Sequence, residues 1–125
     1  MRGRLTVTAA LIGTMFAPAS ATADVSAAFY TPSRNIACSY YRGSTDEELL
    51  CEARWNLAHQ WKINNGRAFK RVSRSTVKGP FFVLRYGRSM RRGQILCTSR
   101  RAGLTCRHTG TGHGFFLSRQ RQRVF

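Results

Sequence analysis

Short apolar or alternating runs, separated by turn residues at close spacing, recur along the chain after residue 35. Runs of this length bounded by Gly and Asn are typical of strands in an all-β domain. The pattern predicts strands over Ile36–Tyr41, Leu49–Arg54, Phe81–Tyr86, Gln94–Thr98, Leu104–His108 and Gly114–Ser118. We therefore expect a small antiparallel β domain, either a sandwich or a partly open barrel.

Glycine and asparagine mark the predicted turns between these strands. Both residue types accept the positive φ angles that tight turns require. The turn segments are Asn64–Gly66, Lys78–Pro80, Tyr86–Gly87, Arg92–Gly93, Ala102–Gly103 and Thr109–Gly112.

One segment, Thr45–His59, also has features of a helix. Thr45 resembles an N-cap, and the acidic residues 46–48 would lie in the first turn, where negative charge is favourable. The apolar pair Leu49-Leu50 and Cys51 fit a strand equally well. We prefer the strand from Leu49 on.

The first 23 residues have the pattern of an export signal. A basic start, Met1 to Arg4, precedes the uncharged and mostly apolar run Leu5–Ala17, and small residues at Ala21 and Ala23 fit signal-peptidase cleavage. The apolar run is well short of the roughly 20 residues that span a bilayer. We therefore expect cleavage near Ala23, which leaves residues 24–125 as one exported domain, secreted or periplasmic, with no membrane span.

A second cleavage site is available at Ala19-Ser20-Ala21. Because this site exists, residues 22–28 are expected to form a loose mature N-terminus.

The chain is strongly basic: Lys and Arg outnumber Asp and Glu 21 to 5, and no acidic residue follows Glu52. Such an excess concentrates polyanions at the surface. Export makes an anionic envelope polymer or a protein the expected partner, and makes nucleic acid an improbable one. We assign anion binding to Arg100, Arg101, Arg107 and Arg119. The alternative is that the charge reflects composition alone, because Arg outnumbers Lys 18 to 3, a bias that GC-rich coding produces.

Four cysteines in a short exported chain predict a disulfide framework, with three possible connectivities. The segment Ser99–Gly103 forms a turn between Cys97 and Cys106, and Arg42–Thr45 similarly lies between Cys38 and Cys51. We therefore predict the bonds Cys38–Cys51 and Cys97–Cys106. Neither spacing is that of a zinc site or a redox pair, so we expect no metal and no cofactor.

Two histidines near the C-terminus, His108 and His113, are the candidate catalytic residues. With Arg107 or Arg119 they could act as the base and acid of a metal-independent ribonuclease. The segment between them is rich in glycine, and a histidine that caps this turn is the preferred interpretation. The sequence contains no phosphate loop, no Gly-x-Ser-x-Gly and no His-Glu-x-x-His motif.

Most aromatic residues are candidates for the core. Three are the least easily placed inside and could stack on sugars or bases: Tyr41, Trp61 and Tyr86.

Several segments together resemble a family of small exported bacterial proteins of unknown function. They are Phe29–Cys38, Cys51-Glu52, Leu84–Gly87, Gly93–Ser99, Gly103–Cys106 and, as the most specific, the Gly-His-Gly-Phe block within Gly112–Arg119. The resemblance implies a secreted or periplasmic domain with paired cysteines, and it implies no catalytic residue. This chain departs from the pattern at Arg34, where Gly is expected in the turn, and between Arg54 and Ile95, where additional cysteines are absent.

We therefore expect a non-enzymatic, exported binding or structural domain of the cell envelope or secretome. The alternatives are a small secreted ribonuclease-like hydrolase that uses His113 with His108, and a cationic antibacterial effector.

Overall fold

The structure is a computed structural model that describes residues 3, 6, 8–11, 13, 25–73 and 75–125. Apart from the few isolated positions among these, the predicted signal peptide and both predicted cleavage sites lie outside the described residues. No helix in the described part of the chain is long and apolar enough to cross a membrane.

The described chain folds into two β-sheets. The strands of the first sheet, sheet A, are β1 (Val25–Tyr30), β2 (Ile36–Arg42), β3 (Glu47–Ala53), β4 (Asn56–Asn64), β5 (Arg67–Val72) and β6 (Phe82–Val83). Those of the second sheet, sheet B, are β7 (Ser89–Arg92), β8 (Ile95–Arg100), β9 (Gly103–His108), β10 (Gly114–Leu117) and β11 (Gln122–Val124).

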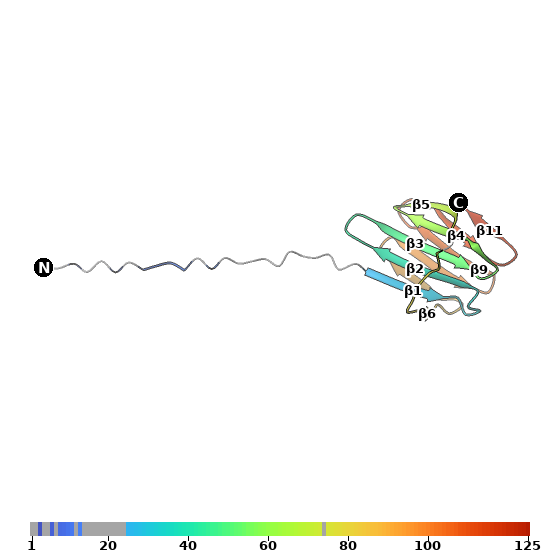
Figure 1. Ribbon diagram of the computed structural model, residues 1–125, viewed down its shortest axis with the longest axis horizontal. Coiled ribbons are helices and arrows are strands. Elements are labelled where there is room, and N and C mark those ends of the chain that lie inside the picture. The colour runs from blue at the N-terminus through green and yellow to red at the C-terminus, as the bar shows by residue number, and fades with distance from the viewer. Residues whose placement is uncertain (1–2, 4–5, 7, 12, 14–24, 74) are drawn as a thin grey trace.

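The two sheets form a sandwich and do not close into a barrel (Figure 1). Sheet A has the order β5-β4-β3-β2-β1-β6, and sheet B has the order β11-β10-β9-β8-β7. Among the described strands, β1 and β6 pair in parallel and the other pairs are antiparallel. The predicted all-β fold is confirmed, as is the preference for a strand over a helix from Leu49 on.

Five of the predicted strands are present with small shifts at their ends, as β2, β3, β8, β9 and β10. The sixth, Phe81–Tyr86, is too long, because only Phe82–Val83 are in strand β6. After β6 the side chain of Leu84 turns into the core. The segment then forms a turn in which the Arg88 amide donates to the Arg85 carbonyl over 3.0 Å.

Five strands, β1, β4, β5, β7 and β11, were not predicted. Three of them, β5, β7 and β11, are edge strands rich in Lys and Arg, a composition common on sheet edges that hides the apolar alternation. The expectation of a loose N-terminus over residues 22–28 is wrong from residue 25 on. There β1 pairs with β2 along its whole length, and Phe29 is buried in the core.

Both predicted disulfides are confirmed, and each joins two cysteines that face one another across an antiparallel pair. Cys38 lies opposite Cys51 in β2 and β3, and Cys97 lies opposite Cys106 in β8 and β9. In both pairs the Cα atoms are 4.1 Å apart, as in the closer of the two pair types of an antiparallel sheet. For loops of this size, chain entropy gives about 3 kcal/mol of stabilisation for each bond.

The two bonds lie in a single core between the sheets, within which all four cysteines are fully buried. Sheet A contributes large apolar side chains that include Phe29, Leu49, Trp61 and Ile63, and sheet B contributes Ile95, Leu104, Phe115 and Leu117. These residues alternate along their strands with more exposed ones, as expected when one face of each sheet is buried.

The segment after β5 also covers part of the opposite face of sheet A. We call residues 73–81 the strap; Arg74 is not among the described residues. The side-chain amide of Gln60 donates a hydrogen bond to the Ser75 carbonyl. The backbone amide of Val77 donates one to a carboxylate oxygen of Glu52 over 3.1 Å. The strap therefore buries Gln60 on the face of β4 opposite to Trp61.

The turn between β4 and β5 contacts the other sheet. Asn65 and Gly66 have φ angles of 47° and 83°, which is the Asn-Gly geometry that the sequence predicts for a tight hairpin. The hydroxyl of Thr111, in the β9–β10 turn of sheet B, donates to the Gly66 carbonyl over 2.6 Å. This hydrogen bond links the two sheets at their ends.

The substitution Gly66→Ala should destabilise the protein more than Gly87→Ala. Their φ angles are 83° and 80°, so each alanine adds similar backbone strain, about 1–2 kcal/mol. A Cβ at position 66 would lie 2.7 Å from Cγ2 of Thr111, whereas one at position 87 meets no atom within 4 Å. In urea unfolding, we expect G66A to be less stable than G87A by about 1 kcal/mol. Equal midpoints would show that Thr111 accommodates the added Cβ without cost.

Candidate functional site

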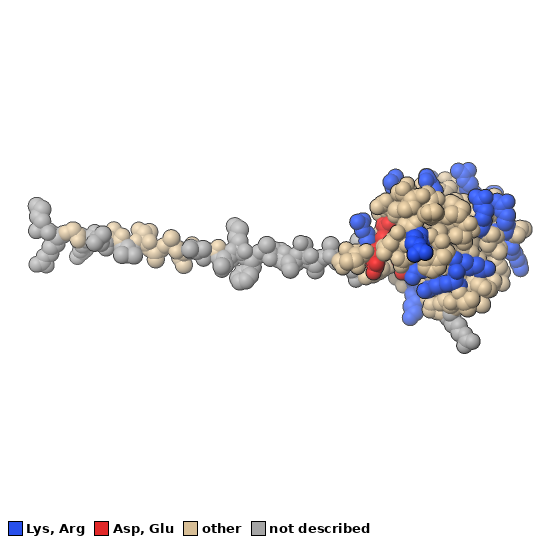
Figure 2. All heavy atoms as spheres, turned by 90° about the horizontal axis from the view of Figure 1, so that it is seen from above, with Lys and Arg blue, Asp and Glu red and all other residues tan. Residues whose placement is uncertain are grey.

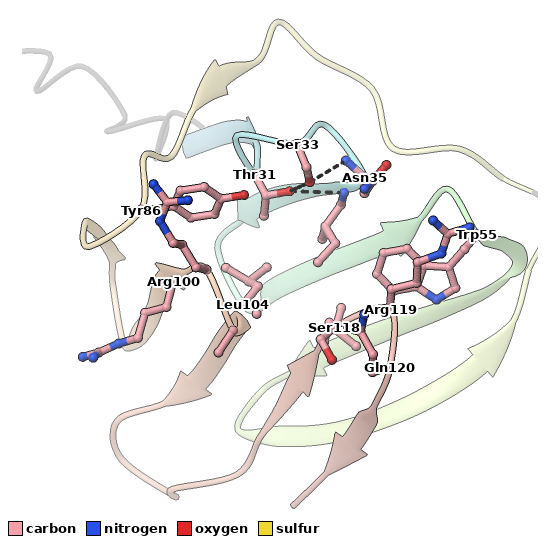
Figure 3. A pocket seen from close by; sticks show the side chains of 15 residues that line it. Thr31, Ser33, Asn35, Trp55, Tyr86, Arg100, Leu104, Ser118, Arg119 and Gln120 are labelled. Carbon is pink, nitrogen blue, oxygen red and sulfur yellow. Dashed lines mark hydrogen bonds between the residues drawn. The ribbon is translucent and has the colours of Figure 1, made fainter.

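A cleft of about 250 Å³ opens where turns from both sheets meet at one end of the sandwich. Fifteen residues line it (Figure 3). They come from the β1–β2 turn, the β3–β4 turn, the β6–β7 connection, the β8–β9 hairpin and the β10–β11 turn. The cleft therefore exists only when the two sheets are packed together.

The β1–β2 turn forms one wall and is held by hydrogen bonds. The amide of Arg34 donates to the Thr31 carbonyl over 2.8 Å, and the amide of Asn35 donates to the Ser33 hydroxyl over 3.3 Å. The Asn35 carbonyl in turn accepts from the Arg54 amide over 2.8 Å, so the β1–β2 and β3–β4 turns are joined.

Two aromatic rings lie on opposite sides of the cleft (Figure 3). Tyr86 is 40% exposed, and the Arg101 guanidinium lies 5.4 Å from the centre of its ring. Trp55 is half-buried and packs against the core. Of the aromatic residues singled out from the sequence, Tyr86 is in the cleft and Tyr41 is exposed outside it. Trp61 was wrongly placed outside: it faces the core beside Cys51, with 1% exposure.

Three of the four arginines assigned to anion binding line the cleft, namely Arg100, Arg101 and Arg119. Arg100 ends β8 on the exposed side of its alternating pattern, and its guanidinium extends away from the cavity (Figure 3). Arg101 and Arg119 are therefore the cations of the cleft itself. Arg107 is exposed on β9 and does not line it.

The remaining polar lining is neutral, because none of the fifteen lining residues is Asp, Glu or His. Hydroxyl and amide groups come from Ser33, Asn35, Ser118 and Gln120. The cleft thus offers positive charge, hydrogen-bonding groups and two aromatic rings.

Acidic residues gather at the opposite end of the sandwich, on the left in Figure 2. There the carboxylate of Glu47 accepts a hydrogen bond of 2.7 Å from the Tyr40 hydroxyl and one of 3.2 Å from the backbone amide of Gln94. Tyr40 and Glu47 belong to sheet A, and Gln94 belongs to the β7–β8 turn of sheet B. Glu47 therefore joins the two sheets.

His108 belongs to this acidic end. Its Nδ1 accepts from the amides of Gly110 and Thr111 over 3.2 and 3.0 Å, so it caps the glycine-rich turn. Its Nε2 lies 3.9 Å from a Glu47 oxygen, and the residue is 8% exposed. His113 is exposed, and its carbonyl accepts from the His108 amide over 2.7 Å. Both ring nitrogens of His108 therefore face protein groups.

Sequence reasoning missed the β1–β2 turn and Trp55 as parts of the site. The signals were present: Thr31–Asn35 has turn chemistry, and Trp55 lies in the two-residue turn between β3 and β4. What joins them is the pairing of β2 with β3, which puts Ile36 opposite Ala53 and so brings the two turns together.

A family model described as a family of unknown function, DUF6636, matches residues 51–125. The chain belongs to this family. No curated protein and no solved structure gives a significant match. The matched region of this DUF6636 protein includes Trp55, Tyr86, Arg101 and Arg119, whereas the β1–β2 wall of the cleft precedes it.

The described residues of the DUF6636 protein include no cluster of three or more His, Cys, Asp or Glu side chains that could hold a metal ion. Its described ionisable groups include one with a large pKa shift. The pKa of the Tyr40 phenol is raised from 10.0 to about 12, first by burial and then by its hydrogen bond to Glu47 and the charge of that residue.

The substitution Glu47→Gln should lower the pKa of Tyr40 but leave it above its ordinary value, because burial remains. In the wild type, the folded state keeps the Tyr40 proton that the unfolded chain releases near pH 10. The free energy of unfolding therefore decreases as the pH rises from 10 through about 12. Absorbance titration of tyrosinate measures the pKa of Tyr40 in both proteins. The variant Tyr40→Phe identifies which titration step belongs to Tyr40. An unchanged titration in E47Q would contradict the assigned role of Glu47.

Proposed function

We propose that this protein is a non-enzymatic binding domain whose cleft at the loop end binds an anionic group on a polymer of the cell envelope. The observation that carries this proposal is the composition of the cleft. Arg101 and Arg119 lie in it beside two aromatic rings, and no carboxylate among its lining residues opposes them.

Charge distribution supports an anion as the ligand. Asp46, Glu47 and Glu48 lie at the far end of the sandwich, so the field at the cleft is dominated by arginine. Arginine presents a planar fork of donors that suits carboxylate and phosphate groups. A cleft edged by several such groups attracts anions over a distance and holds them by charge-assisted hydrogen bonds.

Binding is favoured over catalysis because the candidate catalytic residues and the cleft lie at different ends of the molecule. His108 caps the turn at the acidic end, and both its ring nitrogens are engaged there. The cleft itself offers hydroxyl, amide, guanidinium and aromatic groups. These groups orient and hold a ligand, whereas general acid–base catalysis needs a group that titrates near the working pH.

Export is the second part of the proposal, and it rests on the N-terminal pattern of the sequence. Two buried disulfides agree with it, because such bonds form and persist in oxidising compartments. In that setting the accessible polyanions belong to the envelope or the medium.

Replacing Arg119 with Ala should weaken binding of an acidic polysaccharide such as polygalacturonate by roughly tenfold or more, because a hydrogen bond to a charged group contributes about 1.5–3 kcal/mol. Arg107→Ala is the matched control: it removes the same charge from an exposed arginine outside the cleft. Isothermal titration calorimetry at two salt concentrations measures the affinity of the wild type and of both variants. Wild-type affinity should fall steeply with salt.

Equal losses in R119A and R107A would show that net charge, and not the cleft, governs binding. Cleavage of the polysaccharide during the titration, abolished by His113→Ala, would replace the binding function with a hydrolytic one.

Expression with the natural N-terminus should yield an exported protein that begins at Asp24, because cleavage is expected after Ala23. Intact-mass measurement of the periplasmic and secreted fractions, under oxidising conditions, identifies the first residue. A start at Thr22 would move the cleavage site to Ala21. A full-length protein that stays in the cytoplasm would contradict export.

A further inference from the structure

We infer that the ligand is a chain of acidic sugars that crosses a ridge beside the cleft and also occupies a second hollow on the far side. This inference rests on the proposed function of the cleft and extends it. It adds a second binding site, a length requirement and a role for Arg34.

The ridge consists of the β1–β2 and β3–β4 turns, residues 31–35 and 54–55. Neighbouring residues of these turns line different cavities. Ser33, Asn35 and Trp55 line the cleft, whereas Arg34 and Arg54 line the second hollow. The hydrogen bond from the Arg54 amide to the Asn35 carbonyl fixes the two turns side by side. The two cavities are therefore separated by the width of a pair of hairpin turns.

The second hollow has a volume of about 390 Å³ and lies between the ridge and the strap. Its cations, Arg34 and Arg54, are both exposed. One carboxylate, that of Glu52, also lines it, but an oxygen of Glu52 already accepts the 3.1 Å hydrogen bond from the Val77 amide in the strap. The hollow thus contains two exposed guanidinium groups and one half-buried carboxylate, so its net charge is positive.

Arg34 occupies a backbone position that favours glycine. Its φ angle is 59°, in the left-handed region, and it is one of two described residues other than glycine with a positive φ. An arginine there carries backbone strain that a glycine would avoid. The fold gains nothing evident in return, because the side chain is exposed on the rim of the hollow. Strain that persists without a packing reason points to a ligand.

Both cavities together suit a chain of repeating anionic units better than a single small molecule. Two arginines on each side of the ridge match charges repeated along a polymer, and linking two weak sites raises the affinity of a ligand that reaches both.

Acidic sugars are favoured over single-stranded nucleic acid by the placement of the rings. Tyr86 and Trp55 lie on opposite sides of one cleft and do not form a row along a groove (Figure 3). Single-stranded nucleic acids instead stack successive bases on rings that follow a groove. In the second hollow, Tyr30 and Phe81 stack on each other with their ring centres 4.0 Å apart, so their facing surfaces are not available to bases. The neutral amides and hydroxyls of the cleft suit sugar hydroxyl groups.

The test is a length series of galacturonic acid, its dimer and longer oligomers, measured by calorimetry with the full exported domain. We expect wild-type affinity to rise by roughly tenfold once the oligomer is long enough to reach both cavities. Arg34→Gly and Arg54→Ala should bind the dimer as the wild type does and lose most of the gain with length. Arg107→Ala is the charge-matched control and should keep that gain.

Arg34→Gly also separates binding from folding, because the glycine relieves backbone strain and the variant should unfold at a urea concentration no lower than that of the wild type. An affinity that does not depend on length, or a length gain that R34G and R54A retain, overturns this inference but leaves the proposed function intact if R119A still weakens dimer binding. If oligo-dT binds more tightly than the longest galacturonate oligomer, the ligand is a nucleic acid and the inference is wrong. If the wild type binds neither, the proposed function fails as well.

Discussion

The register of the two disulfide-bonded hairpins determines where the loops of the cleft lie. The Cys38–Cys51 bond fixes β2 against β3, so that Ile36 faces Ala53 and the turn before Ile36 meets the turn after Ala53. The Cys97–Cys106 bond fixes β8 against β9, so that Arg101-Ala102 forms the tip of the hairpin. A slip of one residue in either pair would turn every side chain of the strand to the other face. The two disulfides prevent such a slip, and they thereby keep the turns that line the cleft in place.

The separation of charge follows from the same hairpins. Every strand of a sandwich starts at one end and finishes at the other, so alternate turns collect at opposite ends. The acidic run consists of Asp46, in the β2–β3 turn, and Glu47 and Glu48, which begin β3 next to the β7–β8 and β9–β10 turns of the other sheet. Glu47 is used there to join the sheets. The arginine-rich turns at the other end are left without opposing carboxylates in the cleft, so the acids stabilise the fold without neutralising the proposed binding site.

Local chemistry made the fold largely predictable, whereas the site depends on contacts that sequence does not show. Cysteines on either side of short turns and the Asn65-Gly66 pair identified hairpins correctly, because hairpins are local. Trp61 was misplaced because its neighbour Gln60 is buried as well, on the other face, by a strap distant in sequence. The cleft could not be predicted as a unit. Its walls come from five separate connections in two sheets.

Hydrogen bonds and packing hold several groups around the cleft before any ligand arrives, and this bears on how tightly so small a cavity can bind. The amide of Gly87 donates to the Ser99 carbonyl over 2.7 Å, which fixes the connection that carries Tyr86. Trp55 is held against the core, and Arg101 already lies over the Tyr86 ring. Immobilising a flexible side chain on binding costs roughly 0.5–1.5 kcal/mol. Because packing and ring contacts have already restricted these groups, more of the interaction with a ligand remains as affinity, and a shallow basic cleft can select for shape as well as for charge.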